Sequence, residues 1–301
     1  MADIGLFAAG LFPDAPYDAL ETAAFYNIWL FLWDDAIDGS GGRELSDADE
    51  YSRRSAAFVE HALRCADRFC FCSRDGRPHA PPAPTRTCAS FSDVAGRIRA
   101  AAGERRPDDL VELAGRLREY MEGCVAEHRA RVTGAVPSVE EFYSWRLKTS
   151  STEAFLVLTR ILNDITLPHE IFRSKEHVEM GVCVNKLLIL INELFSLKKE
   201  LKDGAFGNLL PITMRELGTD LEGAVHHIIQ DIDRCIQDYD RHASTMRSAA
   251  AQRHPESLGQ VEKLIAAYQC IATAVLNFSI NSPRYGLAKY RQADGSFLVE
   301  L

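Results

Sequence analysis

The first stretch with residue types suited to chemistry is DDAID (Asp34–Asp38), which follows the apolar and aromatic segment FYNIWLFLW. On a helix, Asp34 and Asp38 lie one turn apart on the same face, with Asp35 about 100° round the axis. Carboxylates so close repel one another, and an apolar lining further penalises their ionised form. A divalent cation removes the conflict, and Mg²⁺ suits oxygen ligands, above all where a phosphate completes its coordination. The pattern predicts a magnesium site beside an apolar pocket; the alternative is an acidic helix end in solvent.

A second stretch, NELFSLKKE, offers hard oxygen donors at helical spacing. Asn192, Ser196 and Glu200 recur every four residues, so an amide, a hydroxyl and a carboxylate share one helix face. This set would hold Mg²⁺ with a single negative charge among its ligands, and Lys199 beside it is placed to contact a phosphate. The preceding residues, VCVNKLLILI, are strongly apolar, so the polar face is expected in or next to the core. The alternative is a solvated helix face with lysine–glutamate pairing.

The two motifs together predict the kind of molecule that binds. Aspartates beside an apolar pocket collect metal ions, and the metal ions bind an anionic head group. The aromatic wall receives an apolar tail. The implied ligand is amphipathic, with a diphosphate at one end and a hydrocarbon at the other.

The elements that position these motifs are predicted to be helices, roughly ten of them in an all-α protein, because apolar residues recur with the helical period and alternating strands are scarce. No composition shift or internal repeat indicates a second domain. The proline-rich stretch Ser73–Thr87 and the stretch Gly103–Asp109 are expected to be exposed loops. Clear helical periodicity covers Leu110–Thr133, Glu140–Leu162, Val178–Lys202, Leu221–His242 and Leu258–Ile280.

Composition argues against several other classes of protein. The 301 residues, 47% of them hydrophobic, suffice for a large core. A formal charge of −9, from 43 acidic and 34 basic residues, argues against a nucleic-acid partner. Eight cysteines without zinc-site spacing predict reduced thiols in a cytoplasmic protein. The N-terminus does not resemble a signal peptide, and no apolar run reaches the ~20 residues that span a bilayer.

With both motifs in place, the chain resembles the class I terpene synthases, most closely the microbial and fungal sesquiterpene cyclases, from about Leu11 to Tyr290. DDAID matches the aspartate-rich motif of that family. Asn192–Glu200 matches its asparagine, serine and glutamate triad, with Glu193 where aspartate is common. The resemblance implies a single-domain helical bundle around a central apolar pocket. It also implies three Mg²⁺ ions, two bridged by Asp34 with Asp38 nearby and a third chelated by the triad.

The resemblance also implies a set of diphosphate ligands. Arg284 and Tyr285, in PRYG, are similar to the arginine–tyrosine pair that the family has near its C-terminus. Arg146 stands 46 residues before Asn192, where the family places an arginine that senses the diphosphate. With Lys199, these residues would hold the diphosphate through charge-assisted hydrogen bonds. Departure of the diphosphate would leave an allylic carbocation.

Two aromatic residues match positions where the family has rings against the carbocation. Phe31 precedes Asp34 by three residues, and Phe278 precedes Arg284 by six. Such rings stabilise positive charge through their quadrupole without acting as nucleophiles. The alternative is that both are plain core residues, as aromatic residues on apolar helix faces usually are.

Two departures from the family pattern lead to further expectations. Members usually carry several tens of residues before the aspartate motif, so residues 1–301 are expected to form one cyclase domain with a short N-terminal cap. The second departure is at Ser150, near which the family often has a glycine. In the family this glycine lies at a helix break, and its carbonyl points into the pocket.

The predicted function is Mg²⁺-dependent cyclisation of C15 farnesyl diphosphate to a sesquiterpene, with a homodimer as one option for the oligomeric state. The tail length rests on the resemblance alone, so C10 and C20 substrates stay open. A chain-elongating prenyl diphosphate synthase would carry a second DDxxD in place of the triad. A class II cyclase would need DxDD, which DIDR at Asp231–Arg234 does not supply. A non-catalytic helical protein that binds isoprenyl diphosphates also stays open, as does a general helical interaction protein.

Overall fold

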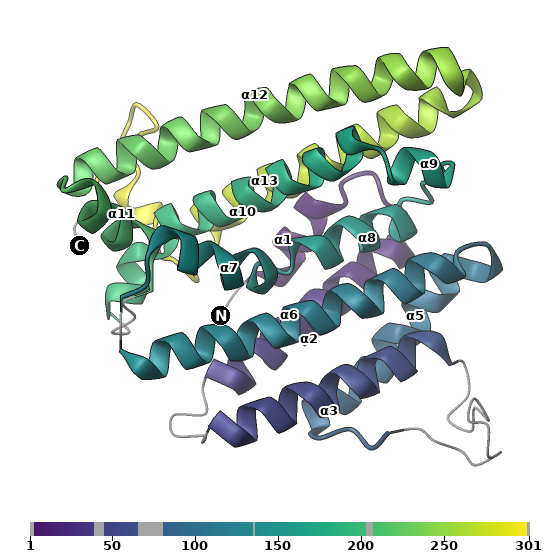
Figure 1. The fold of residues 1–301 in the computed structure, drawn as a ribbon, viewed down its shortest axis with the longest axis horizontal. Helices are drawn as coiled ribbons and strands as arrows, with labels where there is room; N and C mark the ends of the chain where they lie inside the picture. The colour runs from purple at the N-terminus through teal and green to yellow at the C-terminus, as the bar shows by residue number, and fades with distance from the viewer. Residues whose placement is uncertain (1–2, 39–44, 66–80, 135, 203–206, 300–301) are drawn as a thin grey trace.

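The chain is almost entirely helical in the computed structural model (Figure 1). The residues that the structure describes are 3–38, 45–65, 81–134, 136–202 and 207–299.

Within these residues the only pairing of β type is one antiparallel bridge between Arg291 and Phe297. The predicted all-α class is therefore confirmed. Three short 3₁₀ turns accompany the α-helices. The α-helices are α1 (Ile4–Leu11), α2 (Tyr17–Asp38), α3 (Leu45–Arg64), α4 (Arg86–Ala89), α5 (Phe91–Ala102), α6 (Pro107–Thr133), α7 (Val139–Thr149), α8 (Thr152–Leu162), α9 (His169–Phe172), α10 (Lys175–Lys202), α11 (Leu209–Leu217), α12 (Leu221–Arg253) and α13 (Leu258–Asn281).

The helical periodicity predicted over Glu140–Leu162 is confirmed, and the segment forms two helices, α7 and α8. Ser151 separates them with a φ of 57°, in the left-handed region that a non-glycine residue rarely adopts. The break is held from α10, because Ser150 Oγ donates to Asn185 Oδ1 at 2.7 Å and Asn185 Nδ2 donates to the Leu147 carbonyl at 2.9 Å. The break thus falls where the family pattern places one. The other four predicted segments fall within α6, α10, α12 and α13.

The two predicted loops fare differently. Gly103–Asp109 is not a fully exposed loop, because Pro107 begins α6 and Arg106 is only 6% exposed. Proline is favoured at this first helical position, where the missing N–H has no partner to lose. Of the predicted loop Ser73–Thr87, residues 73–80 lie outside the described residues. Residues 81–85 are irregular and mostly half-buried, and α4 begins at Arg86.

The helices pack side by side, and their order across the molecule places the two motifs at one end of it. Figure 1 shows α12 along one edge and α3 along the opposite edge, with α10, α8 and α6 between them. Helix α8 is buried along nearly its whole length, and α1 packs against both α2 and α13. The C-terminal ends of α2, α6 and α10 lie at the same end of the bundle (Figure 1). The aspartate motif on α2 and the triad on α10 therefore lie at the same end of the bundle.

Two helical segments, Lys175–Lys202 and Pro255–Asn281, are long and apolar enough to cross a membrane by length and composition. The most apolar window of the first is 72% buried within the molecule and that of the second is 44% buried. Core helices of soluble proteins pass the same test, so the result is weak as a sign of a membrane span. The absence of a membrane span stays a prediction.

Candidate active site

The aspartate end of α2 is held by aromatic residues and by α6. Trp33 is fully buried and stacks on Tyr51 with ring centroids 5.7 Å apart, which fixes the face that the next residue presents. Asp34 is half-buried, and its Oδ1 accepts a hydrogen bond from the Tyr120 hydroxyl at 2.9 Å. Burial raises the pKa of Tyr120 well above its usual value, so this hydroxyl stays a donor. Asp35 is exposed. The predicted ligand Asp38 ends α2, but its side chain lies outside the described residues.

The triad on α10 includes an unsatisfied polar atom. Ser196 is 3% exposed, and its Oγ has no hydrogen-bond partner among the described residues. A buried hydroxyl without a partner costs on the order of 1–3 kcal/mol. Other buried atoms, such as the indole nitrogens of Trp29 and Trp33, also have no partner among the described residues, so the Ser196 hydroxyl fits a metal ligand chiefly through its place between Asn192 and Glu200. Asn192 and Glu200 are half-buried on the same face. This hard oxygen set suits Mg²⁺. Clusters of three or more His, Cys, Asp or Glu do not occur in the described part of the chain, but that criterion counts neither amides nor hydroxyls.

Arg146 joins the triad to its surroundings. Its guanidinium donates to Glu193 Oε1 at 2.9 Å and to Asn192 Oδ1 at 2.7 Å, and Asn192 Nδ2 donates to the Tyr285 hydroxyl at 2.9 Å. The predicted diphosphate ligands Arg146 and Tyr285 thus meet on the predicted metal ligand Asn192. Burial lowers the pKa of Arg146, but nearby carboxylates, chiefly that of Glu193, outweigh this and raise it above the ordinary value. The guanidinium therefore stays charged.

The Glu193 side chain is the buried counter-charge of this arginine. It is 2% exposed, and its Oε2 also accepts from the Leu209 backbone N–H at 3.0 Å. Burial raises the pKa of Glu193 to about 7, although Arg146 acts in the opposite direction. The sequence indicated Glu193 only as a replacement for aspartate, and its pairing with Arg146 was not foreseen.

A contact between Arg284 and Phe31 connects the two motifs. The guanidinium carbon of Arg284 lies 5.2 Å from the centroid of the Phe31 ring, one turn before Asp34 on α2. The neighbouring Tyr285 bonds to Asn192 on α10. The C-terminal arginine–tyrosine pair therefore bridges the aspartate helix and the triad helix. Lys199 is half-buried on α10, and its phosphate-binding role stays a prediction.

Aromatic rings pack against one another beside these polar groups. Phe278 is 4% exposed, and its ring centroid lies 6.4 Å from that of Phe31 and 6.2 Å from that of Tyr285. Phe7 of α1 was missed by the sequence analysis, yet its ring is 4.8 Å from Phe278 and 6.1 Å from Phe155. Phe7 stands 27 positions before Asp34, so helical periodicity alone could not place it against α13.

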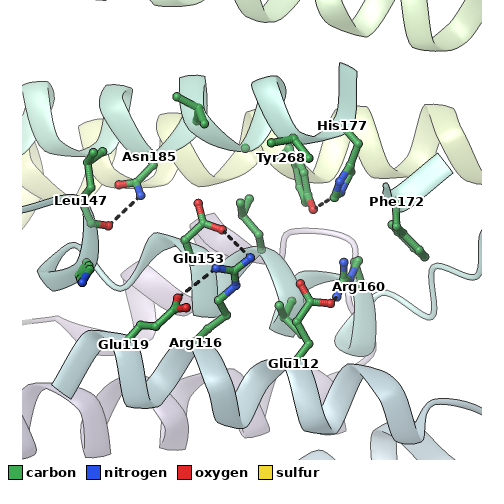
Figure 2. A pocket seen from close by; sticks show the side chains of 16 residues that line it. Glu112, Arg116, Glu119, Leu147, Glu153, Arg160, Phe172, His177, Asn185 and Tyr268 are labelled. Carbon is green, nitrogen blue, oxygen red and sulfur yellow. Dashed lines mark hydrogen bonds and ion pairs between the residues drawn. The ribbon is translucent and has the colours of Figure 1, made fainter. Parts of the chain in front are cut away.

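A cavity of about 380 Å³ lies elsewhere, between α6, α8 and α10 (Figure 2). None of the predicted site residues lines it. Arg116 pairs there with Glu119 and Glu153, and His177 bonds to the Tyr268 hydroxyl at 3.0 Å. This cavity, a charged groove on the molecule, is distinct from the candidate active site around Asn192.

The fold and the site define the class of the protein. Solved structures of two bacterial enzymes superpose on most of the chain at 17% identity. One is germacradien-4-ol synthase from Streptomyces citricolor, with a TM-score of 0.75 over 92% of this chain and 84% of that one. The other is linalool/nerolidol synthase from Streptomyces clavuligerus in complex with 2-fluorogeranyl diphosphate, with a TM-score of 0.76 over 92% of this chain and 86% of that one. The predicted class I terpene synthase fold is confirmed.

The family follows from sequence comparisons. A family model described as terpene synthase family 2, C-terminal metal binding, matches residues 26–238, more than half of the chain. Sesquiterpene cyclase hepA of Aspergillus oryzae is 26% identical over 97% of this chain and 79% of its own length. Pristinol synthase of Streptomyces pristinaespiralis is 29% identical over 73% of this chain and 55% of its own length. The chain belongs to the terpene synthase family, and its prediction as an enzyme of the terpene cyclase class is confirmed at that level.

Proposed function

We propose that the protein is a Mg²⁺-dependent class I terpene synthase that ionises farnesyl diphosphate and cyclises the resulting carbocation to a sesquiterpene. The observation that carries the proposal is the junction at Asn192. Its amide bonds to Arg146 on one side and to Tyr285 on the other, one turn from the unsatisfied hydroxyl of Ser196. This junction places a predicted metal ligand in direct contact with two predicted diphosphate ligands. The name of the fungal relative, a sesquiterpene cyclase, supports the C15 tail.

Bound Mg²⁺ would supply Lewis-acid stabilisation of the departing diphosphate. The family pattern implies three metal ions. The residues that would hold them are Asp34, Asp38, Asn192, Ser196 and Glu200.

The chain's own cations and aromatic rings supply the remaining functions. Arg146, Arg284, Tyr285 and Lys199 would bind the diphosphate oxygens and stabilise charge as the carbon–oxygen bond breaks. The rings of Phe31 and Phe278, with Phe7 beside them, would line the hydrocarbon tail, exclude water and face positive charge on the substrate. We further propose one cyclase domain over the whole chain, acting in the cytoplasm.

The test is incubation of the purified chain with Mg²⁺ and, separately, C10, C15 and C20 prenyl diphosphates, with volatile products identified by gas chromatography–mass spectrometry. A cyclic hydrocarbon or alcohol from the C15 substrate is expected, and Asn192→Ala serves as the control that removes the junction. Products from the C10 or C20 substrate alone would replace the C15 assignment with the alternative chain length. Release of no product from any of the three, with diphosphate binding intact, would leave the non-catalytic isoprenyl-diphosphate-binding protein as the correct description.

A further inference from the structure

Asn208 makes more hydrogen bonds than its place in the fold requires. It is the N-cap residue of α11, it is 1% exposed, and its Oδ1 accepts from the Leu210 backbone N–H at 2.9 Å. That bond alone satisfies the role of an N-cap, for which asparagine, aspartate and serine serve about equally well.

The amide nitrogen of Asn208 points back to α10 instead. Nδ2 donates to the Glu193 backbone carbonyl at 2.9 Å and to Glu200 Oε2 at 3.0 Å. Only an amide supplies an accepting oxygen for the cap and a nitrogen with two donors for α10. One buried side chain therefore spans two turns of α10 and contacts a carboxylate of the predicted metal triad.

Leu209, the next residue, extends this contact to the arginine. Its backbone N–H donates to Glu193 Oε2, while Glu193 Oε1 accepts from Arg146. The beginning of α11 thus contacts a predicted metal ligand directly and a predicted diphosphate ligand through one carboxylate. The beginning of α12 differs, because Asp220 caps it by accepting from the Gly223 N–H, and no bond from Asp220 to the triad occurs among the described residues.

We infer that Asn208 is a positioning residue for the metal site, in addition to being a helix cap. Because Asn208 holds Oε2 of Glu200, the carboxylate has one defined orientation toward the triad face rather than several. Groups that orient metal ligands through hydrogen bonds change metal affinity by about 10–100-fold when they are removed. This inference rests on the proposed function, because it takes Glu200 to be a metal ligand.

The decisive comparison is between Asn208→Ser and Asp220→Ser. Serine keeps a capping oxygen at both positions, but at position 208 it is too short to cap α11 and also reach Glu200. We expect Asn208→Ser to weaken binding of Mg²⁺ with inorganic diphosphate by about tenfold or more, measured by titration calorimetry on the full chain. Asp220→Ser should bind as the wild type does. Excess Mg²⁺ should restore turnover by Asn208→Ser, which a merely structural defect would not allow.

Each result decides between distinct conclusions. Wild-type binding by a folded Asn208→Ser variant would overturn the inference and reduce Asn208 to a helix cap. If Asn208→Ser does not fold, Asn208→Asp keeps both the cap and the side-chain volume while losing both donors, and unchanged binding by that variant would overturn the inference equally. Absence of Mg²⁺–diphosphate binding by the wild type would instead overturn the proposed function itself.

Discussion

The molecule has two networks of charged side chains that differ in their partners and in their burial. The network around Glu193 is buried, whereas in the groove the side chains of Glu112 and Glu119 are 42% and 49% exposed. In the groove of Figure 2, Arg160 pairs with Glu112, and Arg116 with Glu119 and Glu153. Arg160 also pairs with Asp109, which does not line the groove. At the candidate active site, the Arg146 guanidinium donates to one carboxylate, that of Glu193, and to one neutral amide, that of Asn192.

The comparison indicates that ion pairs beside a cavity are not by themselves evidence of a functional site. The groove arginines have carboxylate partners within the fold, and such ion pairs commonly fix how helices pack. The network at Arg146 includes Asn192, whose neutral amide is the kind of oxygen donor a cation can use, and lies next to the Ser196 hydroxyl, which has no partner among the described residues. The groove also has a neutral amide, Asn185, and two buried atoms without a partner in the described residues, Arg160 Nε and His177 Nδ1. What distinguishes the Arg146 network is the set of oxygen donors at four-residue spacing on α10, which suits Mg²⁺.

The largest expected effect comes from removing a predicted metal ligand. Asn192→Ala should lower Mg²⁺-dependent turnover by on the order of 10³-fold, because both the metal oxygen and the link between Arg146 and Tyr285 are lost. Circular dichroism should show an unchanged helical fold. Lys186→Ala, on the exposed face of the same helix, is the control and should retain product formation. Wild-type turnover by Asn192→Ala would place the metal elsewhere.

The two arginine networks can be compared directly with Arg146→Met and Arg160→Met. Removing one partner of a buried pair costs about 3 kcal/mol or more, so both variants should unfold at lower urea concentration. Only Arg146→Met should also lose binding of Mg²⁺ with inorganic diphosphate, measured by calorimetry. Equal loss of binding in both variants would show that the two regions do not differ in function.

The sequence predicted local features better than contacts between helices. The helical periodicity and the two motifs depend on residues a few positions apart, and the structure has them on helices as expected. Within Glu140–Leu162 the periodicity continues across Ser151, so a break caused by its backbone conformation left no mark in the pattern. Only the resemblance to the family, which has a helix break near Ser150, indicated the break.

Contacts between residues far apart in the chain were also not predicted from the sequence. Tyr120 lies 86 residues from Asp34, and neither residue signals the contact in the sequence. Asn208 was also missed, although an asparagine directly before LLP is a recognisable N-cap signal. That signal would have predicted the start of α11 but not the bonds to Glu193 and Glu200, which depend on how α11 returns to α10.

Titration of His177 offers a test on the groove side. Burial, aided by Arg160, lowers the pKa of His177 to about 4. Because the unfolded chain binds this proton more readily, the protein should lose stability as the pH falls from about 6.5 to about 4, by about 3 kcal/mol from this group. Urea unfolding across this range should therefore show a smaller loss for His177→Gln than for the wild type. An identical pH dependence in both would mean that His177 is not buried as a neutral side chain.

Two arginine–phenylalanine stacks, one in each region, allow a comparison in which only small effects are expected. The guanidinium carbon of Arg284 lies 5.2 Å from the Phe31 ring centroid, and that of Arg160 lies 4.6 Å from the Phe172 ring centroid. Replacing either phenylalanine by leucine removes a cation–π contact worth about 0.5–1 kcal/mol, so both variants should lose little stability. Phe31→Leu should still change the ratio of products, because a ring beside the diphosphate ligands would face the substrate cation. Phe172→Leu should leave that ratio unchanged. If gas chromatography–mass spectrometry showed the wild-type ratio for both, Phe31 would have a packing role only, like the half-buried Phe172.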